Sequence, residues 1–98
     1  MAKYLVLWEQ VPENIPKDPV EQAKLFGHLM EIVQKTTKEG RTKDWGMFPG
    51  GNAGYSIHEG TPETSLAIAM QYTPYFRFDV RPVLTSAEVG KVMQSMQP

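Results

Sequence analysis

The glycine-rich segment DWGMFPGGNAGYSIHEG, residues 44–60, most constrains what this chain can fold into. Such a run of glycines is typical either of a phosphate-binding loop or of the turn of a β-hairpin. A phosphate-binding loop needs a helix directly after the glycines. Here the following residues alternate like a strand, and no lysine directly follows the glycines. The pattern therefore predicts a hairpin, with strands over 43–48 and 53–59 and a loop at Pro49-Gly50-Gly51-Asn52.

A long amphipathic helix is predicted before the hairpin. Asp18 is the expected N-cap, Pro19 stands at the first helical position, and Glu21 lies in the first turn. The helix is expected to run to about Lys38 and to end at Gly40. Its predicted apolar face consists of Ala23, Phe26, Met30 and Val33, with Leu25, Leu29 and Ile32 beside them.

Two shorter helices are predicted after the hairpin. Thr61-Pro62-Glu63 begins the first of them, and Pro74 ends it. Leu66, Ala69 and Met70 are expected to face one way, with Ile68 and Tyr72 at the flanks. Thr85-Ser86-Ala87-Glu88 is a capping box for a last helix. That helix carries Val89, Val92, Met93 and Met96.

Two further strands are predicted near the ends of the chain. Residues 3–9, KYLVLWE, are apolar on both faces and predict a central strand, followed by a loop with prolines. Residues 75–84 alternate, with Phe76, Phe78 and Val80 on one face and Arg77, Asp79 and Arg81 on the other. Pro82 cannot donate a ladder hydrogen bond, which favours an edge strand or a strand end.

The resulting order is β-α-β-β-α-β with an extra C-terminal helix. This order predicts an α+β, ferredoxin-like fold, with a four-stranded antiparallel sheet and two helices on one face. Ninety-eight residues leave room for one core, so we expect a single domain over 1–98. The other sheet face must be covered, solvated or used, and an apolar face there would favour oligomerisation.

Composition excludes several classes of function. Ten basic and eleven acidic residues give a net charge of -1, which argues against a nucleic-acid or anionic-membrane partner. No apolar run approaches a membrane span. The absence of cysteine excludes disulfides and fits a reducing interior, so a cytoplasmic location is expected. Two histidines without close spacing do not form a metal site, and the sequence predicts no cofactor.

Two stretches resemble a known superfamily. KDWGMFPGGNAGYSIHEG, and TPYFRFDVRPVL followed by TSAE, resemble the dimeric α+β barrel proteins, including muconolactone-isomerase-like and small uncharacterised members. The resemblance covers nearly the whole chain and implies a homodimer whose sheets enclose a lumen for a small ligand. Members include isomerases, cofactor-free oxygenases, haem-dependent enzymes and proteins without known chemistry. The resemblance transfers no catalytic role to a numbered residue, and the fold alone carries little functional information.

Strand parity nevertheless suggests a catalytic group. If Phe76 and Phe78, and also Tyr55 and Ile57, all pack under the helices, then one open sheet face carries His58, Arg77 and Asp79. His58 is then a candidate base. Arg77 or Arg81 is a candidate for holding a carboxylate or enolate oxygen, and Asp79 for orienting a partner. The alternative is a surface or interface charge ladder beside an ordinary hydrogen-bonded histidine.

Aromatic residues suggest a ligand site beside the hairpin turn. Trp45, Phe48 and Tyr55 flank the turn, and with Arg81 they are candidates for binding a small apolar molecule or an aromatic acid. The other aromatic residues that could line the same apolar pocket are Trp8, Tyr72, Tyr75 and Phe76. The alternative is that these rings are core and dimer contacts, where aromatic residues also concentrate.

Two classes of function remain open. One is a homodimeric ligand-binding or interaction protein without chemistry, and the other is a cofactor-independent isomerase or oxygenase acting on a small aromatic-derived acid. A buried His58 close to Arg77 in a closed cavity favours the enzyme, and a lumen filled by Trp, Met and Phe side chains favours the binding protein. An RNA-recognition module has the same element order, but only Gly54-Tyr55 weakly resembles its signature. Regulatory amino-acid-binding modules share the fold but usually accompany an enzyme domain.

Overall fold

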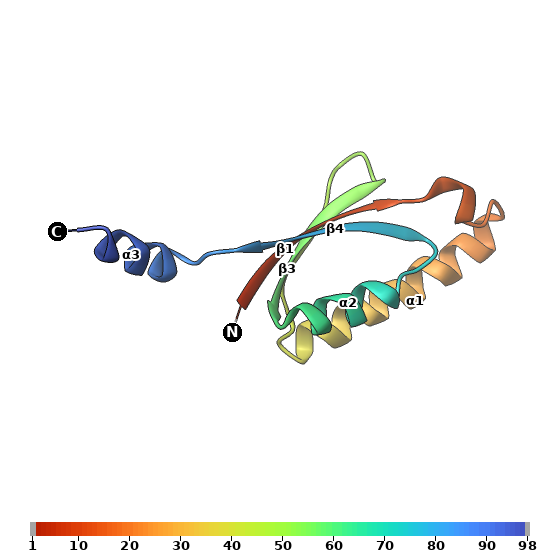
Figure 1. Ribbon diagram of the computed structural model, residues 1–98. Helices are drawn as coiled ribbons and strands as arrows, with labels where there is room; N and C mark the ends of the chain where they lie inside the picture. The colour runs from red at the N-terminus through yellow and green to blue at the C-terminus, as the bar shows by residue number, and fades with distance from the viewer. Residues whose placement is uncertain (1, 98) are drawn as a thin grey trace.

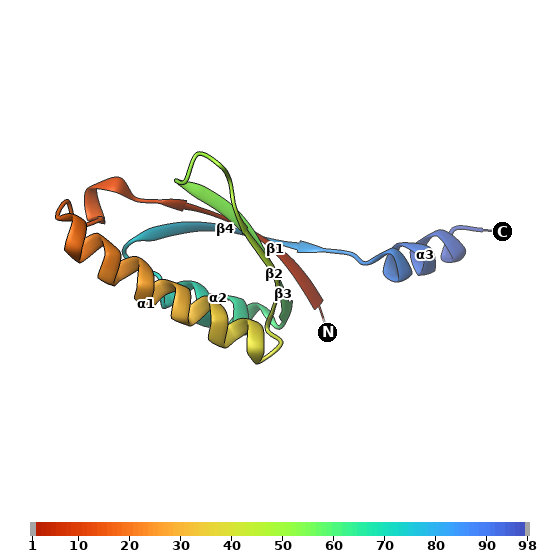
Figure 2. The same ribbon diagram turned by 180° about the vertical axis from the view of Figure 1, so that it is seen from behind.

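A computed structural model describes residues 2–97, so Met1 and Pro98 of the predicted 1–98 domain lie outside the described residues. It contains a four-stranded antiparallel sheet with strand order β2-β3-β1-β4. Helices α1 and α2 lie against one face of the sheet, and α3 extends away from the rest of the protein (Figure 1; Figure 2). This arrangement confirms the predicted ferredoxin-like fold with a C-terminal helix.

The elements follow the predicted order closely. Their bounds are β1 Ala2–Gln10, a 3-10 turn Pro12–Asn14, α1 Pro19–Lys38, β2 Thr42–Met47, β3 Ala53–Gly60, α2 Pro62–Met70, β4 Phe76–Val83 and α3 Ser86–Ser95. All three predicted helix caps are formed: Asp18 accepts a hydrogen bond from the Val20 amide, Thr61 from Thr64, and Thr85 from Glu88.

β1 is the central strand, as its apolar sequence predicts, and it pairs with both β3 and β4. β4 is an edge strand, which is where Pro82 is tolerated. Residues directly opposed in an antiparallel pair share a sheet face. Trp8 opposes Gly54 and Phe78, so this row faces the helices. Leu7 opposes Tyr55 and Asp79, so this row lies on the open face.

The predicted apolar face of α1 faces the sheet, since Phe26, Leu29, Met30 and Val33 line the space between them, but its most buried line is rotated by about one residue from the predicted stripe. Leu29, Val33 and Thr36 are buried, whereas Ala23 is exposed and Met30 is 38% exposed. The buried set follows the i, i+4, i+7 spacing of one helix face. Thr36 extends that face because its hydroxyl bonds to the carbonyl oxygens of Ile32 and Val33, at 3.1 Å each.

The predicted apolar face of α2 does not face the sheet. Ser65 and Ile68 are buried, whereas Leu66 and Met70 are 61% and 64% exposed. A short helix lays one narrow face on the sheet, and Ser65, Ile68 and Tyr72 share that face at i, i+3 and i+7. Leu66 and Met70 therefore point away from the core, although hydropathy alone selects them as core residues.

The segment 44–60 forms the predicted hairpin rather than a phosphate loop. The Phe48 amide donates to the Ala53 carbonyl at 2.8 Å, and Gly51 takes the positive φ of 81° that the turn requires. A register shift lies between Thr42 and Asp44. Because the bulge inserts one residue, Thr42 and Trp45 both face the helices despite their odd separation.

Gly54 permits the closest packing in the sheet. A Cβ at this position would collide with the Gly46 carbonyl oxygen and the Trp8 indole. The indole of Trp8 thus lies directly over the Gly54 backbone, and it is only 6% exposed. A glycine inside a strand often marks such a close approach.

The C-terminal arm, residues 84–97, leaves the compact part of the protein after β4 (Figure 1). The protein is consequently elongated, with principal extents of 63 × 25 × 22 Å. Within residues 2–97, none of the helices combines the length and apolarity that crossing a membrane requires.

Candidate functional site

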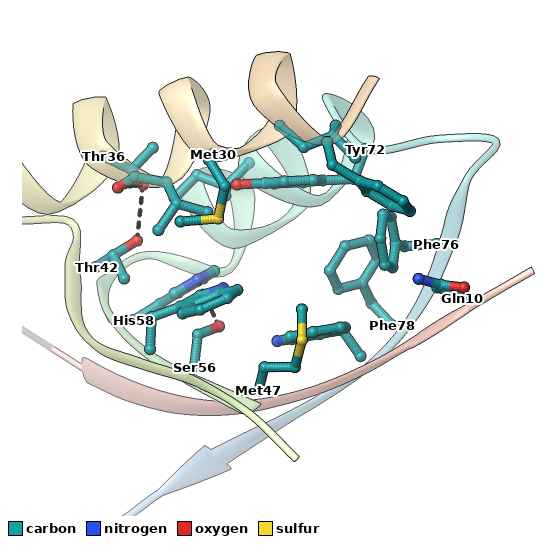
Figure 3. A pocket seen from close by; sticks show the side chains of 16 residues that line it. Gln10, Met30, Thr36, Thr42, Met47, Ser56, His58, Tyr72, Phe76 and Phe78 are labelled. Atoms are coloured by element: carbon teal, nitrogen blue, oxygen red, sulfur yellow. Dashed lines mark hydrogen bonds between the residues drawn. The ribbon is translucent and has the colours of Figure 1, made fainter. Parts of the chain in front are cut away.

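A cavity of about 110 Å³ lies between the two packed helices and the helix-facing side of the sheet. Figure 3 shows its walls, with α1 and α2 above and the sheet below. Its sixteen lining residues are Trp8, Gln10, Phe26, Leu29, Met30, Val33, Thr36, Thr42, Trp45, Met47, Ser56, His58, Ile68, Tyr72, Phe76 and Phe78. None of these is a lysine, arginine, aspartate or glutamate, so the cavity wall carries no permanent charge.

Aromatic rings form much of the wall. Trp8 stacks on Trp45 with centroids 5.6 Å apart, and Phe76 meets Trp8 edge-on at 5.5 Å. Tyr72 packs against Phe78 at 5.6 Å. These separations lie in the range of favourable aromatic pairs. Tyr72, Phe76 and Phe78 gather at one end of the cavity, which we call the aromatic end (Figure 3).

Uncharged polar groups gather at the other end, which we call the polar end (Figure 3). Thr42 donates its hydroxyl to the Thr36 hydroxyl oxygen at 2.9 Å and so links β2 to α1. Ser56 Oγ and His58 Nε2 lie 3.1 Å apart. All four residues are buried, with exposures of 2 to 6%. The polar end is therefore a fixed set of three hydroxyls and one imidazole.

Two buried polar atoms of the cavity residues have no hydrogen-bond partner within the part of the chain that the structure describes. They are Nε1 of Trp8 and Nδ1 of His58. Buried polar atoms in folded proteins are nearly always hydrogen-bonded, and an unpartnered one costs about 1–3 kcal/mol. Trp8 Nε1 can only donate, whereas His58 Nδ1 donates or accepts according to the tautomer. Both atoms are closed off from solvent, so a molecule in the cavity would reach them only after neighbouring side chains move.

Burial sets the protonation state of the two titratable groups in the wall. It lowers the pKa of His58 from its usual value near 6.5, so the imidazole is neutral at pH 7. Burial also raises the pKa of Tyr72 to about 12, so its hydroxyl remains protonated. The cavity is therefore uncharged at neutral pH, with a neutral imidazole hydrogen-bonded to Ser56.

The lowered pKa of His58 makes stability depend on pH. Below about pH 6.5 His58 becomes protonated in the unfolded chain but stays neutral in the folded protein. The contribution of His58 to the free energy of unfolding should therefore be complete above pH 6.5 and should be lost as the pH falls toward the lower pKa of the folded state. The slope from one proton is at most about 1.4 kcal/mol per pH unit. Urea unfolding at several pH values between 5 and 8 should show a smaller slope in His58→Leu than in wild type. His28→Gln, at an exposed helix position, is the control and should keep the wild-type slope.

The structure separates the residues predicted to act together. His58 faces the helices and lines the cavity, because it opposes Tyr4 and Thr42 in the sheet. Arg77 and Asp79 lie on the open face, so the catalytic group predicted from the sequence is not assembled in this chain. The condition for it fails because Tyr55 and Ile57 do not pack under the helices.

The arginines on the open face are engaged with neighbouring carboxylates. Arg77 lies 3.5 Å from Glu9, and Arg81 lies 2.9 Å from Asp79. All four side chains are more than half exposed, and exposed pairs of this kind contribute about 0–1 kcal/mol each. The geometry is that of a charge ladder on the surface.

The predicted aromatic ligand residues are also divided. Trp45 lines the cavity. Phe48 and Tyr55 do not line it; they stack on each other at 6.5 Å, and Tyr55 donates its hydroxyl to Asp44 at 2.9 Å. Trp8, Tyr72 and Phe76 line the cavity as the sequence suggested, whereas Tyr75 does not. Sequence reasoning missed Thr36 and Thr42 as wall residues, and no local signal in the sequence indicates them.

The types of residue present limit how the cavity can bind a metal ion or a polar ligand. Among residues 2–97, no three His, Asp or Glu side chains come together as a group that could hold a metal ion. Without a charged group in the wall, the polar groups available are the hydroxyls, the imidazole, the Gln10 amide and the indole N–H groups of Trp8 and Trp45.

Comparison with known families assigns the chain to a family, but the description of that family names no function. A family described as domain of unknown function DUF3303 matches residues 2–97, nearly the whole chain. The chain belongs to the DUF3303 family. No curated protein matches it significantly. Within this DUF3303 protein, the fold and the cavity are therefore the observations from which a function must be argued.

Proposed function

We propose that the protein binds a small neutral aromatic molecule in the cavity between the helices and the sheet. One observation carries this proposal: a single cavity joins an aromatic end to an uncharged polar end (Figure 3). Binding sites for small molecules have this composition, with apolar and aromatic walls and a few fixed polar groups. The aromatic end would stack on the ring, and the polar end would receive one polar substituent.

The volume of the cavity limits the size of the ligand. An apolar cavity of about 150 Å³ in another protein holds one benzene molecule. A cavity of about 110 Å³ is slightly smaller, so a ring with a substituent requires a modest adjustment of the walls. Met30 and Met47 can make it, because they line the cavity, are 38% and 51% exposed, and have flexible side chains. Their movement would also open a path to the unpartnered atoms of Trp8 and His58.

The absence of charge in the wall favours a neutral ligand over the aromatic acid expected from the sequence. A carboxylate buried without a partner is costly. The arginines expected to hold it, Arg77 and Arg81, lie on the opposite sheet face and pair with Glu9 and Asp79. A phenolic hydroxyl, an indole N–H or a carbonyl oxygen matches the neutral groups that are present.

Ligand size and charge can be tested by calorimetry and thermal shift. Phenol, indole and benzaldehyde should bind and raise the melting temperature, and benzoate of the same ring size should bind at least tenfold more weakly. Met30→Trp should fill the cavity and abolish binding, whereas Met70→Trp, on the exposed side of α2, should leave binding unchanged. Tighter binding of benzoate than of the neutral compounds, or full binding by Met30→Trp, would contradict the proposal.

The more specific relationship suggested by the sequence, to the dimeric α+β barrels, is retained as part of this proposal. The ferredoxin-like sheet leaves one face without helices, where Leu5, Leu7 and Ile57 are partly exposed. In a homodimer two such faces would enclose a second compartment, distinct from the cavity described above. Light scattering at low micromolar protein tests the dimer, which should have about twice the chain mass of 11.1 kDa.

The neutral His58 imidazole supports an enzyme as the second candidate function. It is buried in the cavity, carries no charge at pH 7 and is hydrogen-bonded to Ser56. These are properties of a general base. A cofactor-independent isomerase would use His58 to move a proton within a bound substrate, without help from Arg77. Exchange of a ligand C–H for deuterium in wild type, lost in His58→Gln with binding retained, would favour the enzyme over a pure binding protein.

A further inference from the structure

The C-terminal arm presents an apolar face that the other described residues, 2–83, leave uncovered. Val89, Val92 and Met93 follow the i, i+3, i+4 spacing of one helix face, and Met96 continues it. With Leu84 at the start of the arm, these side chains are 43 to 73% exposed. No α3 residue is buried, and the helix lies apart from both sheet and helices in the two views (Figure 1; Figure 2).

A helix of ten residues needs a packing partner. Helices shorter than about 12–15 residues are marginal in water, and most helical stability in proteins comes from packing an apolar face. The capping box of Thr85 and Glu88 fixes the start of α3 but covers none of its apolar side chains. The sequence thus specifies an amphipathic helix whose partner surface must lie elsewhere.

A groove on the same protein offers such a surface. It lies between α2 and the edge strand β4, and its wall is almost entirely apolar. Leu66 on α2 and Val80 on β4 line it and are 61% and 38% exposed. The other lining residues are Tyr4, Pro62, Ser65, Ala69, Phe78 and Pro82. The groove and the arm are therefore two uncovered apolar surfaces of one chain, one concave and one convex.

We propose that the arm of one copy packs in the α2–β4 groove of a second copy, and that the contact is reciprocal. In a two-fold dimer each copy supplies one arm and one groove. The arm-to-groove contact therefore forms two times, and both arms and both grooves are covered. The exposed apolar side chains of the arm form a patch of roughly a few hundred Å², on the scale of the largest patch of a typical monomeric protein, and patches of that size are often functional. Two such contacts together reach the scale of a stable interface, roughly 1,200–2,000 Å².

The position and charge of the arm favour a second copy over the other occupants. The arm points away from its own groove, and only Leu84 and Thr85 separate β4 from α3. A membrane surface is disfavoured because the helix carries one acidic and one basic residue, Glu88 and Lys91, rather than a basic polar face. This arm contact is independent of ligand binding in the cavity. It is also a different interface from the sheet-to-sheet dimer proposed above, and the variants below distinguish the two.

Light scattering after size exclusion tests the arm contact. Wild type at micromolar concentration should be a dimer, and Val92→Lys/Met93→Lys should shift the dissociation constant at least a hundredfold toward monomer. Lys91→Glu, on the opposite side of α3, is the control with the same size of charge change and should remain a dimer. Circular dichroism spectra of the variants should match the spectrum of wild type, which would show that loss of the dimer is not caused by misfolding. A monomeric wild type would overturn the arm contact and the sheet-to-sheet dimer together. A lysine double variant that stays dimeric would overturn the arm contact alone, because the dimer would then be formed by another surface such as the open sheet faces.

Cross-linking then identifies the groove, because the chain contains no cysteine. The double variant Val92→Cys/Leu66→Cys, oxidised at micromolar concentration, should give covalent dimers. A mixture of the two single variants should give the mixed dimer as its main cross-linked product. A disulfide formed within one monomer would mean that the arm folds back onto its own groove and would overturn the exchange between copies. Absence of any cross-link between these positions would overturn the α2–β4 groove as the docking site.

Discussion

Gly54→Ala should lower the free energy of unfolding by about 3 kcal/mol, at the upper end of the usual cost of overpacking. The added methyl group would meet the Gly46 carbonyl oxygen on one side and the Trp8 indole on the other. Neither can move easily, since Gly46 belongs to the paired strand β2 and Trp8 is held by Trp45 and Phe76. Urea denaturation measures the loss directly.

Gly50→Ala is the matched control for this substitution. Gly50 lies in the hairpin turn, has no atom within 4 Å of an added Cβ, and does not have a positive φ. Its replacement should change stability by less than about 1 kcal/mol. Equal losses in both variants would mean that glycine flexibility, rather than the contact with Trp8, explains Gly54.

Trp8→Ala should destabilise the protein by about 3–5 kcal/mol, the usual range for removing a buried tryptophan. Trp8 is 6% exposed and touches a ring on each side, so its removal leaves a void next to the existing cavity. Phe48→Ala is the control, because Phe48 also stacks on an aromatic ring but is 47% exposed. It should cost less than about 1.5 kcal/mol, and a similar loss in both variants would contradict the central role of Trp8.

Trp8→Phe separates packing from hydrogen bonding. The smaller ring keeps most of the aromatic contact, and the change removes an indole N–H that has no protein partner. Its stability loss should therefore be well below that of Trp8→Ala. If the indole N–H donates a hydrogen bond to a ligand, Trp8→Phe should weaken the binding of benzaldehyde at least fivefold more than the binding of toluene. Benzaldehyde can accept a hydrogen bond, and toluene cannot. Equal effects on both compounds would show that Trp8 contributes shape alone.

These two positions explain why the site was harder to predict than the fold. The order and type of the elements follow from local sequence, because each signal is carried by a few adjacent residues. Such signals are the helix N-termini at Asp18-Pro19 and Thr61-Pro62 and the glycine turn. The cavity brings Trp8 on β1 together with the pair Thr36 and Thr42 and with Phe78 on β4, three parts of the chain that are far apart in sequence. No local sequence pattern around one of these segments predicts that the others lie beside it in the fold.

The separation of His58 from Arg77 has the same origin. Alternation along a strand determines that His58 and Ser56 share a face and that Arg77, Asp79 and Arg81 share a face. It does not determine which face of each strand the helices cover. That is decided by pairing, in which Tyr4 of β1 opposes both His58 and Pro82 and so places His58 on the side of the helices.

The sequence by itself determined the order of elements, their caps, the hairpin and the central place of β1, and it limited β4 to an edge position or a strand that ends at Pro82. These depend on local periodicity, turn chemistry and the missing proline N–H. Only the tertiary structure decided the rotation of α1 and α2, the bulge that puts Thr42 and Trp45 on one face, and the uncharged cavity. The physical reason is that burial is a property of two surfaces in contact, and a single strand or helix specifies only one of them.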